Sequence, residues 1–375
     1  MPRSCKCQHN PGYTMDGVFA LYRNPYASEY TYVRQTGGEP LALHSYEELA
    51  GRSGFVFAPF RISAECPLLL ISPDIVERRR VDTEVDFDVS LFHERDTAGE
   101  RSRYGEVFAR FHEKLGKGDF SKIVLSRCSE EEAAEPLDCK KLFMRACVLY
   151  PRMFIALVST PQCGTWLMAT PEILLEGGAD GWHTMSLAGT MPIDSNADTD
   201  ADLEERKLNG IIKEWNGKNV REQKYVSSYI KECLAHFSNT VDEHGPYTVR
   251  AGLVKHLRSD FYFNMQDGYI GKLIGSLHPT PAVCGMPKAD TYGFICGNEA
   301  YERKYYSGFT GPLCFDGSTH LYVILRCMQI DGCKYRLYAG GGLLSDSDED
   351  EEWLETEAKM ETMRKCLSIK RMSTY

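Results

Sequence analysis

The stretch Ser121-Lys-Ile-Val-Leu-Ser-Arg127 is short, apolar and rich in β-formers, and it lies between two segments with helical spacing. Apolar residues recur at helical intervals over 104–115 before it and over 142–148 after it. A strand with a helix on each side is typical of a mixed α/β chain. This stretch therefore predicts the fold class, and the order of elements on both sides agrees with it.

More strands are expected toward both ends of the chain. The runs with strand character are 17–22, 55–60, 67–72, and the pair 153–158 and 164–168, which reads as a hairpin around Pro161. Residues 321–326 and 335–338 bracket Asp331-Gly332, a strong hairpin turn. Helices are expected over about 202–237, with a break near Gly217, and after the acidic stretch 346–357. A polar stretch at 93–101 is the best boundary between an N-terminal strand-rich part, 1–95, and a main part, 100–370.

Composition excludes several classes of protein. The chain has 375 residues, 43% of them apolar, and 43 basic against 53 acidic residues give a net charge of −10. That balance disfavours nucleic-acid binding, and no apolar run approaches the ~20 residues that cross a bilayer. The first residues lack the apolar core of a secretory signal, and the 14 cysteines have no metal-binding or disulfide spacing. We expect a cytoplasmic protein with reduced thiols and a small-molecule substrate.

Two ionisable residues lie at the ends of apolar runs. Lys122 opens the strand at 122–126, and Glu172 lies between Pro171 and an apolar run. In the ordinary interpretation, Lys122 is an edge lysine facing water and Glu172 a carboxylate in a turn. In the functional one, burial lowers the pKa of the lysine so that it acts as a base, and keeps the carboxyl protonated so that it acts as an acid.

Three charged residues near the C-terminus share one helix face. Glu352 and Glu355 are three residues apart, and Lys359 follows four residues later. They form either a solvated face with one ion pair or a set of oxygen ligands for Mg²⁺, a hard cation that is usually held by few carboxylates plus water and substrate. Glu222, within the long helical segment, is a distant candidate for the same site; otherwise it is an ordinary exposed helix residue.

The remaining candidates are glycine-rich or isolated polar positions. Ala188-Gly-Thr190 and Gly340-Gly-Gly342 allow close approach of the backbone to a ligand, but neither fits a nucleotide-binding motif. Arg326 ends an apolar strand, where an arginine needs an anion, so it is a candidate carboxylate clamp. His278, before Pro279, is most often a structural loop residue.

Together, five stretches in this order resemble the chorismate-utilising enzymes, which include isochorismate, salicylate, anthranilate and aminodeoxychorismate synthases. They are 121–127, Ala169-Thr-Pro-Glu-Ile-Leu-Leu175, Ser186-Leu-Ala-Gly-Thr190, Leu277-His-Pro-Thr-Pro-Ala282, and 338–344 with 352–359. The resemblance covers about residues 100–370. It implies an α/β (α+β) fold like that of anthranilate synthase component I, with two large antiparallel sheets stacked as a sandwich and flanked by helices.

Within this family the chain looks most similar to isochorismate synthases. Lys122 matches the family's water-activating lysine, which the ammonia-using anthranilate synthases lack. Aminodeoxychorismate synthases usually have a nucleophilic lysine before the Gly-Thr pair, where this chain has Ala188. The run at 277–282 is also typical of isochorismate synthases. Salicylate synthase, an ammonia-using synthase subunit and a non-enzymatic chorismate-binding paralogue remain as alternatives.

The resemblance also implies roles for individual residues. Lys122 would be the general base for water attack at C2 of chorismate, and Glu172 the general acid for the departing C4 hydroxyl. Glu222 and Glu355, with Glu352 in support, would hold Mg²⁺ on the ring carboxylate. The expected substrate-binding residues are Gly189, Thr190, His278, Ala282, Arg326, Gly340 and Lys359. The product would feed menaquinone or siderophore biosynthesis, with no obligatory glutaminase subunit, nucleic acid or membrane as a partner.

Three positions depart from the family pattern. An acidic residue usually precedes the metal-binding glutamate by three positions, where this chain has Asn219. A histidine often follows that glutamate, where this chain has Gln223, and an arginine often follows the Gly-Thr pair, where it has Met191. The change at 219 removes one negative charge near the expected cation, so we expect weaker Mg²⁺ binding and an unchanged reaction type.

Overall fold

Two nine-stranded antiparallel sheets dominate the computed structural model, which describes residues 17–85, 89–193, 215–251, 254–266 and 268–371. The first sheet has, in spatial order, β15 (Gly285–Met286), β8 (Lys122–Glu132), β19 (Lys334–Leu343), β18 (Cys327–Asp331), β10 (Gly164–Thr170), β9 (Phe154–Thr160), β1 (Val18–Arg23), β2 (Glu29–Gln35) and β6 (Ile75–Arg80).

The second sheet has the order β13 (Val241–Ala251), β14 (Val254–Phe263), β12 (Gly181–Pro192), β11 (Ile173–Gly178), β17 (Ser318–Val323), β16 (Phe309–Leu313), β4 (Gly54–Ala58), β5 (Leu68–Ile71) and β3 (Leu41–Leu43). A short parallel pair, β7 (Ser90–Phe92) and β20 (Ile369–Arg371), ties the two parts of the chain together. Strands from the first 80 residues therefore extend both large sheets.

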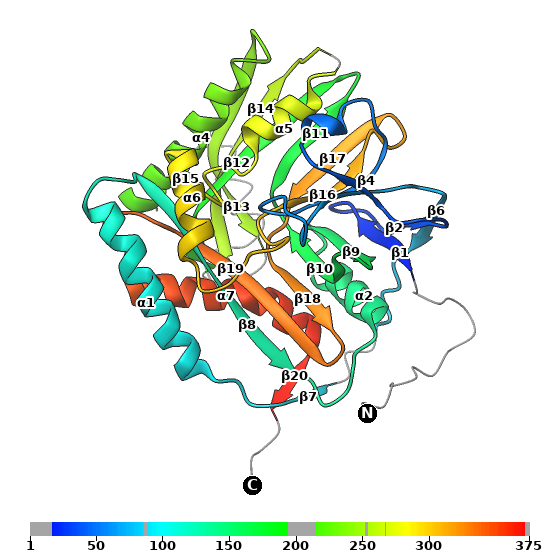
Figure 1. Cartoon of the computed structure of the whole chain (residues 1–375), viewed down its shortest axis with the longest axis horizontal. Helices are drawn as coiled ribbons and strands as arrows, with labels where there is room; N and C mark the ends of the chain where they lie inside the picture. The colour runs from blue at the N-terminus through cyan, green and yellow to red at the C-terminus, as the bar shows by residue number, and fades with distance from the viewer. Residues whose placement is uncertain (1–16, 86–88, 194–214, 252–253, 267, 372–375) are drawn as a thin grey trace.

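Helices cover the outer faces of these sheets (Figure 1). In the described residues they are α1 (Thr97–Gly116), α2 (Cys139–Leu149), α4 (Gly217–Leu234), α5 (Ile270–Leu277), α6 (Lys288–Asn298) and α7 (Glu349–Leu367), with a 3₁₀ turn at Glu47–Leu49. The side chains of Asp96, Asp138, Asn216 and Asp348 cap the first turns of α1, α2, α4 and α7. Helix α7 packs on β19 and α4 packs on β12, so the two helices approach the sheets from different sides.

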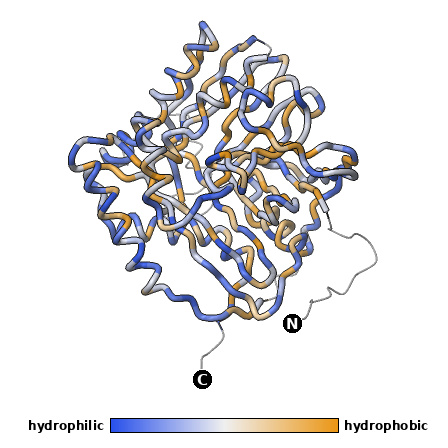
Figure 2. The backbone as a smooth tube through the Cα atoms, viewed as in Figure 1, coloured by the Kyte–Doolittle hydropathy of each residue, from blue (hydrophilic) through white to orange (hydrophobic). Residues whose placement is uncertain are grey.

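Aromatic rings fill the space between the sheets. Phe154 of the first sheet stacks on Tyr322 of the second, with ring centroids 4.2 Å apart and an angle of 7°. Phe57 stacks on Tyr305 at 4.1 Å, and Trp166 packs edge-on against Tyr305. Burial of such a ring stabilises the fold by about 2–3 kcal/mol. Figure 2 shows the same division, with hydrophobic residues along the central strands and mostly hydrophilic residues on the outer turns of α1.

The structure confirms the predicted fold class and corrects one hairpin. The turn at Asp331-Gly332 is present, but the strand before it is β18, which pairs with β19. The run 321–326 was wrong as its partner, because β17 ends at Val323 and belongs to the second sheet. The chain crosses between sheets at 324–326, where Arg326 adopts a left-handed conformation with φ 45°. For a non-glycine residue this costs roughly 1–2 kcal/mol.

The structure describes only part of the helix that was expected over 202–237. Helix α4 begins at Gly217, where Asn216 caps it, whereas the N-terminal half of the expected helix, 202–214, lies outside the described residues. In the described parts of the chain every cysteine is free. Among those same residues, no helix is long and apolar enough to span a bilayer.

Candidate active site

A small cavity of about 50 Å³ lies where β8, β12, β14, β19 and the two helices α4 and α7 meet. Its wall combines backbone from glycine-rich strand segments with charged side chains. Eight of the predicted site residues line it: Glu172, Gly189, Thr190, Glu222, Ala282, Arg326, Gly340 and Lys359. The cavity thus brings together residues that are up to 187 positions apart, from Glu172 to Lys359.

Lys122 is the first residue of β8 and is completely buried, so it is not an edge lysine facing water. Its Nζ lies 3.1 Å from Oε1 of Glu222 and donates a hydrogen bond of 2.7 Å to the carbonyl of Pro281. These two acceptors fix the nitrogen; Glu222 lines the cavity, whereas Lys122 is not among the lining residues. Gly342 leaves room for the pair, because a Cβ there would collide with the Glu222 carboxylate.

Glu172 follows β10 and is 2% exposed, so it is not a turn carboxylate in water. Its backbone is held on both sides: its carbonyl accepts from Val323 N, and the hydroxyl of Thr170 donates to Val323 O. Burial raises the pKa of Glu172 to about 8, although Lys122 and other nearby cations act to lower it. The carboxyl therefore holds its proton at neutral pH and is able to donate it.

The Gly189–Thr190 turn is anchored to helix α4. β12 has a bulge here, and Gly189 has a φ of 69°, which favours glycine. Gly189 N donates to Oε2 of Glu222 at 3.1 Å, while the Asn219 amide accepts from Thr190 N and donates to Thr190 O. Asn219, which departs from the family pattern, thus holds backbone at this turn.

His256, on β14, is a site residue that the sequence reasoning missed. It is buried in the cavity wall, and its Nδ1 lies 2.9 Å from the carbonyl of Gly189. Its Nε2 lies 2.9 Å from Nη2 of Arg326. Burial and the charge of Arg326 hold the pKa of His256 well below its usual range, so the neutral ring accepts a hydrogen bond from the guanidinium and orients it.

The predicted metal-binding residues of α7 lie beside β19. A Cβ at position 341 would come within 2.6 Å of Oε2 of Glu352 and 3.6 Å of Oε1 of Glu355. Burial and the neighbouring Glu355 raise the pKa of Glu352 to about 7. Lys359, on the next turn, donates to Glu355 at 2.6 Å and to the carbonyl of Gly340 at 2.8 Å.

These residues fit a hard cation, although not as a complete cage. In the part of the chain that the structure describes, no three His, Cys, Asp or Glu side chains converge as ready metal ligands. Oε2 of Glu352 is, however, buried without a hydrogen-bond partner, next to a second carboxylate. Mg²⁺ commonly takes one or two carboxylates and completes its shell with water and substrate, so this donor set is compatible with it.

His278, predicted to contact substrate, lies outside the cavity wall. Its ring is 2% exposed and packs edge-on against Tyr46 and Phe309, with centroids 5.5 Å and 5.1 Å away. Burial lowers the pKa of His278 to about 3, so the ring is a neutral part of an apolar cluster. His278 is not among the residues that line the cavity, so substrate contact by this side chain stays a prediction.

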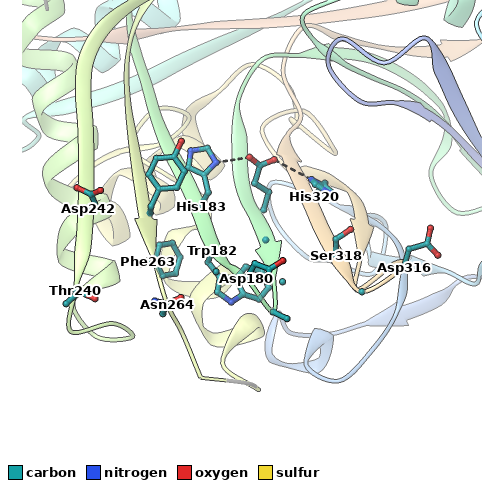
Figure 3. A pocket seen from close by; sticks show the side chains of 17 residues that line it. Asp180, Trp182, His183, Thr240, Asp242, Phe263, Asn264, Asp316, Ser318 and His320 are labelled. Carbon is teal, nitrogen blue, oxygen red and sulfur yellow. Dashed lines mark hydrogen bonds and ion pairs between the residues drawn. The ribbon is translucent and has the colours of Figure 1, made fainter. Parts of the chain in front are cut away.

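A second, wider pocket opens at the end of the second sheet (Figure 3). There the Glu176 carboxylate lies 2.8 Å from Nδ1 of His183 and 3.4 Å from Nδ1 of His320, and His183 also contacts Asp260 at 2.7 Å. Every one of these ionisable groups is bonded to another. The enclosed cavity, which retains a protonated carboxyl and an unpartnered carboxylate oxygen beside it, is the better candidate active site.

Comparisons with known proteins point in the same direction. The family model described as chorismate binding enzyme matches residues 75–368, and so begins earlier than the expected residue 100. The isochorismate synthase MenF of Escherichia coli K12 is 28% identical over 258 residues, which are 68% of this chain and 58% of that protein. The isochorismate synthase DhbC of Bacillus subtilis is 28% identical over 265 residues, covering 68% and 65%.

These alignments span less than two thirds of either relative's length. The fold extends further than the sequence match. The solved structure of the menaquinone-specific isochorismate synthase MenF from E. coli superimposes with a TM-score of 0.77 over 93% of this chain and 88% of that one, at 21% identity. The two-sheet architecture described above is therefore shared along nearly the whole chain.

Proposed function

The chain belongs to the family of chorismate binding enzymes, and from this premise we propose that it is an isochorismate synthase. The proposed reaction moves the hydroxyl function of chorismate from C4 to C2: water adds at C2, and the C4 hydroxyl leaves as water. The reaction consumes and releases one water, so it needs no oxidant, reductant or second substrate. The product would enter menaquinone or siderophore biosynthesis.

The observation that carries the proposal is a buried acid next to a buried amine. Glu172 is protonated at neutral pH because burial raises its pKa to about 8. Lys122 is close enough for its charge to act on that carboxyl, and its nitrogen is fixed by Glu222 and Pro281. In the proposed mechanism Glu172 donates its proton to the leaving hydroxyl and Lys122 takes a proton from the attacking water. Each such group typically contributes ~10²–10⁴ in rate.

The other residues of the cavity bind and orient the dianionic substrate. Arg326 is positioned by His256 and presents a guanidinium to a carboxylate, while Lys359 supplies a second cation. The bulge at Gly189–Thr190, together with Ala282 and Gly340, allows the ring to approach the backbone. Buried cations are needed here, because the protein carries a net charge of −10 and would otherwise repel a dianion.

Mg²⁺ is part of the proposal as the cofactor. Glu222, Glu355 and Glu352 would hold it, and the bound cation would offset the charge of the ring carboxylate. The fit of the cation rests on the neighbouring carboxylates of Glu352 and Glu355 and on Oε2 of Glu352, which has no hydrogen-bond partner.

Identification of the product tests the activity directly. The purified full chain is incubated with chorismate, with Mg²⁺ and with a chelator, and products are separated by chromatography. Isochorismate as the stable product supports the proposal. Salicylate with pyruvate would replace it by a salicylate synthase, and turnover only with added ammonia would replace it by an aminating synthase. Unchanged chorismate under all conditions would contradict it.

Glu355→Ala tests the metal assignment. Removal of one carboxylate from the proposed site should raise the Mg²⁺ concentration for half-maximal rate by about tenfold, which corresponds to about 1.4 kcal/mol of lost binding. The measurement is the initial rate against Mg²⁺ concentration at saturating chorismate. Asp346→Ala, which removes an exposed carboxylate just before the same helix, is the matched control and should leave the midpoint unchanged. A midpoint for Glu355→Ala equal to that of the wild type would remove this residue from the site.

A further inference from the structure

Each of the three proposed metal-binding carboxylates is paired with a lysine. The pairs are Lys122–Glu222, Lys218–Glu352 and Lys359–Glu355. Two of these lysines already have roles in the proposed function, at the attacking water and at the substrate. Lys218 has none, and its position near the start of α4 brings it across to α7.

The ion pair of Lys218 and Glu352 is buried, and its two side chains differ in their exposure to solvent. The lysine side chain is 17% exposed and that of Glu352 only 1%. Nζ of Lys218 and the hydroxyl of Ser347 both donate to Oε1 of Glu352. Oε2 has no partner, although it is buried and faces the neighbouring Glu355. A buried acceptor without a donor costs about 1–3 kcal/mol, so this oxygen is available to a further positively charged ligand.

The charge of Lys218 reaches beyond its direct partner. Burial acts to lower the pKa of Lys218, but Glu352, Glu355 and Glu222 together raise it above its usual value. The lysine is therefore an ammonium that interacts with all three carboxylates. A divalent cation bound by the same carboxylates would lie close to this ammonium, and the two positive charges would repel each other strongly in a buried site.

We propose that Lys218 is a built-in competitor of Mg²⁺, an ammonium that occupies Glu352 and must leave it before the cation binds. The inference rests on the proposed function, because it concerns the same cation site. The long side chain of Lys218 is partly exposed, so the ammonium has a path toward solvent. The chain thereby keeps its carboxylates neutralised without a metal, and its affinity for Mg²⁺ is lower than the same carboxylates would otherwise provide.

The test measures Mg²⁺ binding without substrate. The wild type, Lys218→Met and Lys218→Gln are titrated with MgCl₂ alone in a calorimeter at pH 8.5. Both neutral variants should bind Mg²⁺ roughly tenfold more tightly, since a like charge has been removed from the site. Two variants are used because Gln still donates a hydrogen bond to Glu352, which protects the fold if Met does not. Lys218→Arg keeps the charge and should show no gain.

Arg221→Met is the matched control. It removes one positive charge from the same helix, one turn further on, where Arg221 pairs with Asp346 and both side chains are about half exposed. Solvent screens this charge, so Mg²⁺ affinity should change by less than about twofold. An affinity of the neutral Lys218 variants that equals or falls below that of the wild type overturns the proposal, as does the absence of binding in every variant.

The product assay keeps the two proposals separate. If the wild type makes isochorismate but the Lys218 variants gain no affinity, the competitor role is wrong and the activity stands. If the wild type neither makes isochorismate nor binds Mg²⁺, both proposals are wrong.

Discussion

Glu172 immediately precedes β11 and Glu176 lies within it, four positions later, yet the two carboxyls hold opposite protonation states. Burial raises the pKa of Glu172 to about 8. Burial would also raise the pKa of Glu176, but hydrogen bonds from His183 and His320 outweigh it and lower the pKa to about 2. One carboxyl lines the enclosed cavity, and the other lines the open pocket of Figure 3.

The difference lies in the hydrogen-bond partners. The Glu176 carboxylate accepts hydrogen bonds from two imidazoles, and His183 is in turn held by Asp260, so the charges of the open pocket compensate one another. Glu172 is near cations but its side chain accepts no hydrogen bond from any described residue, so burial dominates. A self-compensated cluster stabilises structure, whereas an uncompensated acid is available for chemistry.

The largest expected effect separates the two carboxyls by activity. Glu172→Gln keeps the size of the side chain and removes the transferable proton, so turnover should fall by ~10²–10⁴. Glu176→Gln is the matched substitution in the open pocket and should keep turnover within about twofold, because that residue is not in the cavity. The measurement is the initial rate of chorismate consumption at saturating substrate and Mg²⁺, with circular dichroism as a check of folding.

The turnover of either variant could contradict the proposed difference between Glu172 and Glu176. Near-normal turnover in Glu172→Gln would remove this residue from the acid role, and a large loss in Glu176→Gln would make the open pocket part of the active site. Lys122→Ala is expected to lose as much turnover as Glu172→Gln, since it removes the proposed base while the cavity remains.

Sequence reasoning could predict what depends on local pattern and on motif order. It predicted the strand that begins at Lys122, the hairpin 153–168 and eight of the residues that line the cavity. The local pattern alone could not predict which glutamate is buried, because Glu172 and Glu176 both border the same apolar run and differ in what other segments bring beside them; only the order of the family motifs selected Glu172. His183 and His320, which fix Glu176, come from two different strands.

The same reason explains why the sequence did not reveal the surroundings of His278 and His256. Both are isolated histidines, and a single sequence does not reveal their neighbours. His256 lies opposite Thr190 in the register of β12 and β14, and this pairing alone places it in the cavity. His278 is part of the family stretch 277–282, but its ring packs against Tyr46, which comes from a distant part of the chain. Strand register and long-range packing, not composition, decide both positions.

A second prediction sharpens the comparison through stability. With its pKa raised to about 8, Glu172 binds a proton in the folded protein that the unfolded chain releases above its ordinary pKa near 4.5. The free energy of unfolding of the wild type should therefore fall as pH rises from about 4.5 to 8, by about 3–5 kcal/mol at most from this residue. Glu172→Gln removes this pH-dependent contribution of Glu172 to the free energy of unfolding, so the variant should be more stable than the wild type at pH 8 and approach it at pH 5.

The measurement is urea unfolding followed by tryptophan fluorescence at both pH values. The same stability difference between Glu172→Gln and the wild type at pH 5 and pH 8 would show that Glu172 does not carry its proton in the folded state. An inactive variant that is more stable at pH 8 would show that this carboxyl is retained at a cost to the fold.

The smallest expected effect is on the stability of the protein through Glu176, whose contribution to the free energy of unfolding depends on pH in the direction opposite to that of Glu172. Because the folded-state pKa of Glu176 is lowered to about 2, its stabilising contribution is fully present above pH 4.5 and is lost as pH falls toward 2. Glu176→Gln keeps the shape of the side chain but gives up the charge facing His183 and His320, so the free energy of unfolding should fall by about 1–2 kcal/mol at pH 7. The deficit should narrow as pH falls from 4.5 toward 3, because the unfolded wild-type chain then binds a proton at Glu176 that the folded protein, with its pKa near 2, does not. Urea midpoints of the two proteins at pH 7, 4.5 and 3 measure this convergence. A deficit that stays constant down to pH 3 would attribute the loss to altered packing of the amide, and the two carboxyls would then no longer differ by charge compensation.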